Sequence, residues 1–136
     1  MNAMELKKRA LVVDDELDVR EYLKEVLDGE GFEVLQAGDG VEALALVLSQ
    51  EALPTLIISD VQMPKKDGIT LLKELKANPQ LASIPVILLT GIRERTGISF
   101  TAEEIADTIG AEPAAYLEKP ISAQELVKTI RTVLGV

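Results

Sequence analysis

The order of apolar segments is the feature that most limits how this chain can fold. Five short apolar runs alternate with segments whose apolar residues have helical spacing, and the runs cover residues 10–13, 32–37, 55–59, 85–89 and 114–117. This alternation predicts a mostly parallel sheet with helices on both faces. The runs are also unbroken, as expected when both faces of a sheet are covered. We therefore expect an α/β fold built on a five-stranded parallel sheet.

The helical segments have recognisable ends. The first should place these apolar residues on its inner face: Val19, Tyr22, Leu23, Val26 and Leu27. It should stop near Gly29 and Gly31, because glycine accepts the left-handed backbone of a helix end. A second helix should open at the capping sequence Asp39–Glu42. Its apolar residues run through Leu48 on several sides, which predicts tight packing against the sheet.

Capping boxes also predict the last two helices. Thr101–Glu104 should begin a fourth helix that turns Ile105 and Ile109 inward. Ser122–Glu125 should begin the last helix, whose apolar face holds Leu126, Ile130, Val133 and Leu134. A third helix, which lies in the sequence between the second and the fourth, should carry Ile69, Leu72 and Leu75.

Polar side chains stand where the apolar runs end. Asp14 and Asp15 follow the first run, Asp60 follows the third, Thr90 the fourth, and Lys119 comes just after the fifth. In parallel α/β sheets the functional crevice lies beyond the carboxyl ends of the strands. Taken singly, each of these residues has an ordinary explanation as a helix cap, strand end or surface charge. All five ordinary explanations would have to hold at once to remove a shared site.

The chemistry of this set is consistent. Three carboxylates at one sheet edge repel one another unless a cation or proton intervenes. Mg²⁺ (or Mn²⁺) prefers oxygen ligands and would also neutralise an incoming phosphoryl group. Lys119 adds a positive charge, Thr90 adds a hydroxyl donor, and an aspartate carboxylate can attack phosphorus to form an acyl phosphate. The sequence therefore predicts an aspartyl-phosphate site at this edge of the sheet.

Five short motifs stand in order along nearly the whole chain: Leu11–Glu16, Ile57–Pro64, Asp67–Gly68, Leu89–Gly91 and Tyr116–Pro120. Together they resemble the receiver domain of bacterial two-component response regulators. The resemblance implies a flavodoxin-like, doubly wound (βα)5 three-layer sandwich with strand order 2-1-3-4-5. It also implies a single receiver domain over residues 1–136, with its core at about 9–134.

The resemblance assigns roles at the acidic site. Asp60 would be the phosphoacceptor, and Asp15 and Asp60 would bind Mg²⁺ directly. Asp14 would act on the metal largely through water, and the backbone carbonyl of Gln62 would complete the protein ligands. Lys119 would contact the phosphoryl oxygens, and its bond to the following proline would be cis.

The resemblance also assigns a switch. Thr90 and Tyr116 match the family's switch pair, in which the hydroxyl turns toward the phosphoryl group and the ring rotates inward. The change would be relayed to the surface formed by the fourth helix, fifth strand and fifth helix. Gly91 lacks a side chain and should leave the phosphoryl site open. We expect Gly91, Gln62 and Ile92 to tune the lifetime of the phosphoryl group.

Two other functions remain open. A degenerate receiver would bind a protein partner without phosphorylation, although the complete set of site residues argues against it. A phosphatase with an aspartate nucleophile would need a second acid two residues after Asp60, where this chain has Gln62. Without histidine, the chain has no phosphohistidine relay residue of its own. We therefore expect a regulatory domain rather than an enzyme.

Charge and composition restrict the partners. The formal net charge of −9 disfavours direct nucleic-acid binding. The lack of cysteine, signal peptide and membrane-spanning run favours a cytoplasmic protein. The resemblance implies a sensor histidine kinase or His-phosphotransfer protein as phosphodonor, and a downstream protein target or an output domain missing from this chain. Phosphorylation-dependent homodimerisation is a further hypothesis.

The chain departs from the family between Thr90 and Lys119, where it is several residues longer. The extra length falls in Arg93–Phe100, with a little more around Glu112–Pro113. The added residues either alter partner choice or the switch, or form a tolerated surface insertion. No output domain follows Leu134, which leaves a stand-alone regulator and a segment of a longer regulator or hybrid kinase as alternatives.

Overall fold

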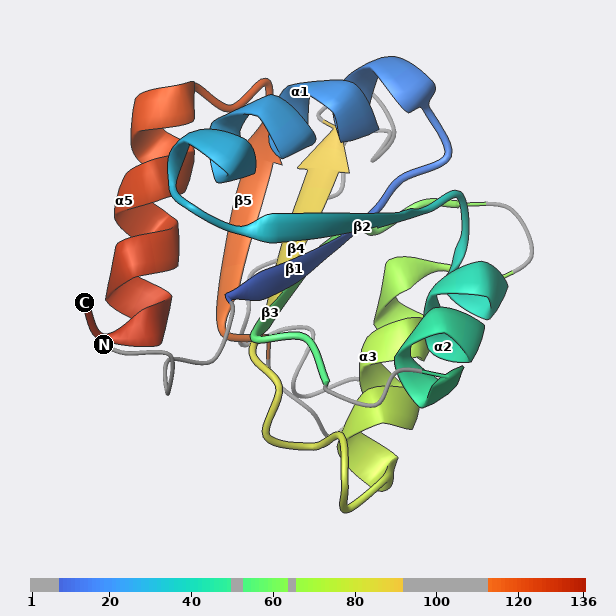
Figure 1. Ribbon diagram of the computed structural model, residues 1–136. Coiled ribbons are helices and arrows are strands. Elements are labelled where there is room, and N and C mark those ends of the chain that lie inside the picture. The colour runs from blue at the N-terminus through green and yellow to red at the C-terminus, as the bar shows by residue number, and fades with distance from the viewer. Residues whose placement is uncertain (1–7, 50–52, 64–65, 92–112) are drawn as a thin grey trace.

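The computed structural model describes residues 8–49, 53–63, 66–91 and 113–136, which form one sheet covered on both faces (Figure 1). The strands are β1 (Arg9–Val13), β2 (Glu33–Ala37), β3 (Leu56–Asp60), β4 (Val86–Gly91) and β5 (Ala115–Lys119). All neighbours pair in parallel, in the order β2-β1-β3-β4-β5. The predicted α/β class, the flavodoxin-like fold and the strand order are confirmed.

Helices cover the sheet in pairs. They are α1 (Leu17–Gly29), α2 (Gly40–Ser49), α3 (Gly68–Ala77) and α5 (Ala123–Leu134). In Figure 1, α1 and α5 lie on one side of the sheet, and α2 and α3 on the other. The helix expected from Thr101 and the lengthened Arg93–Phe100 stretch lie outside the described residues. Within the described ranges, every helix is too short or too polar to cross a lipid bilayer.

The alternation of side chains along each strand divides the core in two. In β1, Leu11 and Val13 pack on the side of α2 and α3, while Ala10 and Val12 pack on the side of α1 and α5. The same alternation continues past the last apolar residue of a strand. It therefore decides on which side of the sheet each polar residue at the carboxyl edge emerges.

The helix caps form largely as predicted. Asp39 Oδ1 accepts the Glu42 N–H at 2.8 Å, and Glu42 Oε1 accepts the N–H of Gly38 at 2.6 Å. Ser122 Oγ accepts the Glu125 N–H at 3.0 Å. After α1, Gly31 has a φ of 85°, in the left-handed region that a glycine accepts readily. These local bonds fix where each helix begins and ends.

Two packing predictions are wrong in part. Tyr22 is 41% exposed, although Leu23 and Leu27 on the same helix are buried as expected. The second helix does not bury all its apolar residues, since Val41 is 51% and Leu48 60% exposed. Both errors have one cause, because helical spacing predicts a face but not how far the neighbouring elements extend around it.

Candidate functional site

The carboxyl end of β1 supplies two of the acidic residues. The Asp14 N–H donates to the Ala37 carbonyl of β2 at 3.1 Å, which extends the ladder by one residue. Asp14 Oδ1 accepts the Glu16 N–H at 2.9 Å and so turns the chain toward α1. The Asp14 side chain is fully buried, whereas Asp15 is exposed. The predicted pair therefore consists of one interior and one solvent-facing carboxylate.

Asp60 is the last residue of β3, the strand next to β1 in the sheet, and is 1% exposed. Its backbone lies against the start of α3, where the Gly68 N–H donates to the Val61 carbonyl at 2.8 Å. A Cβ atom on Gly68 would stand only 2.1 Å from the Asp60 carbonyl oxygen. Glycine is thus required for this close approach of the two backbone segments.

Asp14, Asp15 and Asp60 meet at the edge of the sheet, as the sequence predicted. One carboxylate oxygen from each lies within 4.8 Å of the others. Lys119 Nζ donates to Asp14 Oδ2 at 2.9 Å and lies 3.3 Å from Asp60 Oδ1. The lysine therefore bridges the two buried carboxylates.

The charges at this edge do not balance. Three carboxylates and one ammonium leave a formal charge of −2, which a single divalent cation would neutralise. All three acidic donors are oxygens, the ligand type that Mg²⁺ and Mn²⁺ prefer. The arrangement of these residues fits a hard divalent cation.

Lys119 is held in its charged form. Burial is the largest single influence on its pKa and lowers it, because charge is disfavoured away from water. The hydrogen bond to Asp14 and the negative charges of Asp60 and Asp14 together outweigh burial, so the pKa is raised above its usual value. The ammonium therefore remains protonated at neutral pH and is available to an anion that enters the site.

The two residues of the predicted switch come from β4 and β5, on the side of the sheet that α2 and α3 cover. Tyr116 is partly buried and packs against the core cluster on the side of α2 and α3. It is the β-partner of Leu88, and Thr90 lies two residues beyond Leu88, so strand alternation puts Thr90 on the same side. Thr90 is 1% exposed. The structure thus places the pair on one face, and their switching role stays a prediction.

The residues expected to tune the site differ in position. Gly91 is the last residue of β4 and is half-buried, while Gln62 is exposed in the connection between β3 and α3. Ile92 lies outside the described residues. The Lys119–Pro120 peptide bond is cis, as the family resemblance implied.

Some residues around the site were not assigned a role from the sequence. The Arg20 guanidinium donates to the Asp14 carbonyl at 2.7 Å and to Gln36 Oε1 at 3.1 Å, which ties the acidic loop to α1 and β2. The sequence gives only a weak signal for the contacts of Arg20, namely an arginine within two helical turns of an acidic pair. Gly68 belongs to a recognised motif, but only its distance to Asp60 reveals why glycine is needed there.

Known proteins with a similar sequence cover most of this chain. Residues 10–131 match a family model described as the response regulator receiver domain. The chain is 42% identical over 128 residues to the transcriptional regulatory protein CpxR of Klebsiella pneumoniae, with 93% of this chain and 49% of that protein covered. It is 33% identical to the DNA-binding response regulator MtrA of Mycobacterium leprae, with 95% and 52% covered. The chain spans about half the length of these relatives.

Solved structures agree with the sequence match. The chemotaxis response regulator CheY4 of Vibrio cholerae is similar with a TM-score of 0.77 and 31% identity, over 95% of this chain and 100% of that one. The receiver domain of a signal transduction histidine kinase from Syntrophus aciditrophicus is similar with a TM-score of 0.77 and 30% identity, over 94% and 90% of the chains. The similarity therefore extends through nearly the whole fold.

Proposed function

The chain belongs to the response regulator receiver domain family of two-component systems, and from this we propose that it is a phosphoacceptor switch in which Asp60 receives the phosphoryl group. One observation carries the proposal. The buried Asp60 carboxylate lies within 4.8 Å of those of Asp14 and Asp15 and 3.3 Å from the Lys119 ammonium. A nucleophile, ligands for a cation and a positive charge for the phosphoryl oxygens thus share one sheet edge.

The proposed reaction is a phosphoryl transfer from a phosphohistidine donor. A carboxylate oxygen of Asp60 attacks phosphorus, so that a P–O bond forms while the P–N bond to the donor imidazole breaks. The imidazole nitrogen leaves with the electron pair of the broken bond, and a proton taken up by the ring leaves it neutral. Asp15, Asp60 and the Gln62 carbonyl would hold a divalent cation, with Asp14 acting through water. Such a cation would neutralise charge on the phosphoryl oxygens.

The chain's own residues would respond to the added group. Lys119 already lies between two carboxylates, so a phosphoryl group on Asp60 gives its ammonium a new anionic partner. The Thr90 hydroxyl would donate to a phosphoryl oxygen, and the Tyr116 ring would turn inward behind it. This movement would reach the surface made by the fourth helix, β5 and α5. Residues at the rim, namely Gln62, Gly91 and Ile92, would set how long the phosphoryl group lasts.

The partners follow from the same proposal. A sensor histidine kinase or His-phosphotransfer protein would supply the phosphoryl group, and a downstream protein or an output domain would read the switch. Residues 1–136 would act as one receiver domain. One way in which the phosphorylated domain could signal is by forming a homodimer. A degenerate receiver that binds partners without phosphorylation is disfavoured because the set of site residues is complete and Lys119 contacts both Asp14 and Asp60.

Incubation with acetyl phosphate tests the proposal directly. With Mg²⁺ present, the protein should gain the mass of one phosphoryl group, and the gain should be lost in base, as expected for an acyl phosphate. Borohydride reduction followed by peptide mapping should place the modification at Asp60. The proposal fails if no modification forms, or if it forms equally with Mg²⁺ and with excess chelator.

Magnesium itself should stabilise the fold. At about 100 times its Kd, a ligand that binds only the folded state adds about 2.7 kcal/mol to the free energy of unfolding. We expect Asp15→Asn to remove most of this gain, because it takes away the charge of a proposed Mg²⁺ ligand. Asp15 is exposed, so the change should not disturb the core. Urea unfolding with and without Mg²⁺ measures the effect. Asp28→Asn, at the far end of α1, should retain the full gain, and equal gains in both variants would contradict the assigned ligand.

A further inference from the structure

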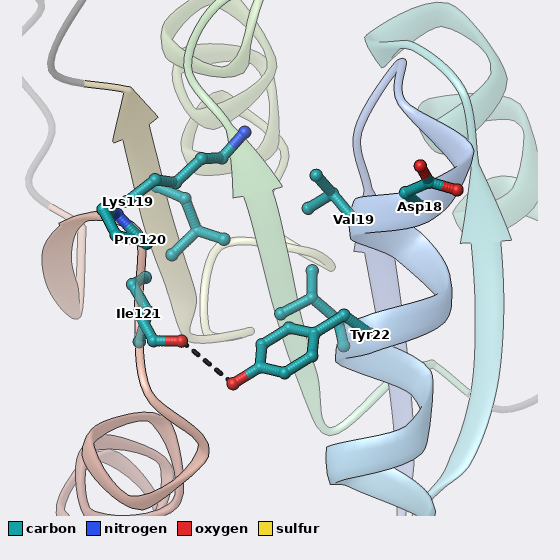
Figure 2. Close-up of a pocket in the computed structure, with 8 residues that line it drawn as sticks. Asp18, Val19, Tyr22, Lys119, Pro120 and Ile121 are labelled. Atoms are coloured by element: carbon teal, nitrogen blue, oxygen red, sulfur yellow. Dashed lines mark hydrogen bonds between the residues drawn. The ribbon is translucent and has the colours of Figure 1, made fainter.

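An apolar cleft separates α1 from the segment that follows β5 (Figure 2). It has a volume of about 480 Å³, and most of its wall is apolar, with Val19, Leu23 and Leu89 among the lining residues. Tyr22 borders it on the helix, and the Lys119–Ile121 segment borders it on the opposite side.

A single hydrogen bond drawn in Figure 2 crosses the cleft. The Tyr22 hydroxyl donates to the backbone carbonyl of Ile121 at 2.9 Å and joins residues 99 positions apart in the sequence. Tyr22 is 41% exposed, so its ring contributes little to the buried core. The contact that distinguishes this side chain from an aliphatic one is therefore the bond made by its hydroxyl.

The carbonyl that accepts this bond is close in the chain to the lysine of the site. Only Pro120 separates Ile121 from Lys119, and the Ile121 side chain is buried with the core on the side of α1 and α5. The Lys119 ammonium is held at the far end of a long side chain, 2.9 Å from Asp14 Oδ2. A shift of the backbone at Ile121 therefore changes where that ammonium can reach.

The hydrogen bond from Tyr22 to Ile121, called the tether below, is also connected to the site at its Tyr22 end. Tyr22 lies on the helix that directly follows Asp14 and Asp15, and Arg20 on the same helix donates to the Asp14 carbonyl at 2.7 Å. The hydroxyl bond thus joins the element that follows the acidic pair to the segment that carries the lysine.

We propose that Tyr22 is a positioning residue, whose hydroxyl holds the Lys119–Ile121 segment so that the Lys119 ammonium stays beside Asp14 and Asp60 and meets the phosphoryl oxygens there. The inference rests on the proposed phosphorylation of Asp60. It goes beyond that function because it assigns a role to a residue outside the acidic cluster and the switch pair. The role is exerted through the backbone of Ile121.

Tyr22→Phe removes the hydroxyl and keeps the ring. With acetyl phosphate and saturating Mg²⁺, we expect the phosphorylation rate constant to fall about three- to tenfold, the range that the loss of one net hydrogen bond produces. Because Mg²⁺ is saturating for both proteins, a change in metal affinity does not contribute to this difference in rate. Thr132→Val is the matched control, since it removes a hydroxyl that donates to the Lys128 carbonyl within α5, and its rate should equal that of wild type.

A double-mutant cycle separates positioning from general loosening of the fold. In a Lys119→Ala background, Tyr22→Phe should have no further effect on the rate, because the group it positions is gone. A hydroxyl that merely stabilises the fold would lower the rate by the same factor in both backgrounds. Equal factors, or an unchanged rate in the single variant, would overturn the proposal.

Measurements on the metal-free protein keep this inference distinct from the proposed function. In the Tyr22→Phe variant, the amides of Ile121 and Ser122 should exchange hydrogen several times faster than in wild type, and the side-chain NMR signals of Lys119 should shift. If wild type takes no phosphoryl group, the proposed function fails, while these signals still report on the tether. Unchanged exchange and unchanged Lys119 signals would refute the tether itself.

Discussion

Asp60→Asn is expected to lower the fraction of protein that acetyl phosphate phosphorylates by about a hundredfold or more, which leaves only background modification. An amide oxygen is neutral and a poor nucleophile, so the variant cannot form the acyl phosphate. The change nearly preserves shape at a position that is 1% exposed, and the fold should therefore be retained. Intact mass spectrometry after incubation with donor and Mg²⁺ measures the loss.

Asp39→Asn provides the matched control for this result. Asp39 is also an aspartate after a strand, but it caps α2 by accepting the Glu42 N–H, and asparagine caps a helix equally well. This variant should be phosphorylated like wild type. An equal gain of mass in the Asp60→Asn variant would place the phosphoryl group on another residue and would remove the central claim.

Gly68→Ala should have the second largest effect. The new Cβ would stand 2.1 Å from the Asp60 carbonyl oxygen, a distance at which the backbone must move. Overpacking of this kind costs about 1–3 kcal/mol of unfolding free energy. The movement displaces the residue that carries the nucleophile, so we also expect slower phosphorylation. Urea unfolding and the acetyl phosphate assay measure the two effects separately.

Gly29→Ala is the control for the glycine substitution. Gly29 is the last residue of α1, and a Cβ there would meet nothing within 4 Å. Alanine is a better helix former than glycine, so this variant should gain up to about 1 kcal/mol. If Gly68→Ala proved as stable as Gly29→Ala, the close approach of α3 to Asp60 would not constrain the site as the structure indicates.

The acidic site could be predicted because strand ends are visible in the sequence. Each apolar run stops abruptly, and parallel strands bring their carboxyl ends to one edge, so Asp14 and Asp60 had to be near each other. The position of Tyr22 could not be predicted in the same way. Helical spacing assigned it to the buried face, yet it lies at the border of that face, where the cleft beside α1 leaves it 41% exposed.

The sequence by itself determined the fold class, the receiver resemblance and the residues that gather at the sheet edge, because hydrophobic periodicity and strand ends are local properties of the chain. Only the tertiary structure decided which atoms meet there. The bridge from Lys119 to Asp14 and Asp60, the approach of Gly68 to the Asp60 carbonyl and the bond from Tyr22 to Ile121 are such contacts. They depend on the path of the connecting segments and the register of the strands, which bring distant parts of the chain together and which no local pattern specifies.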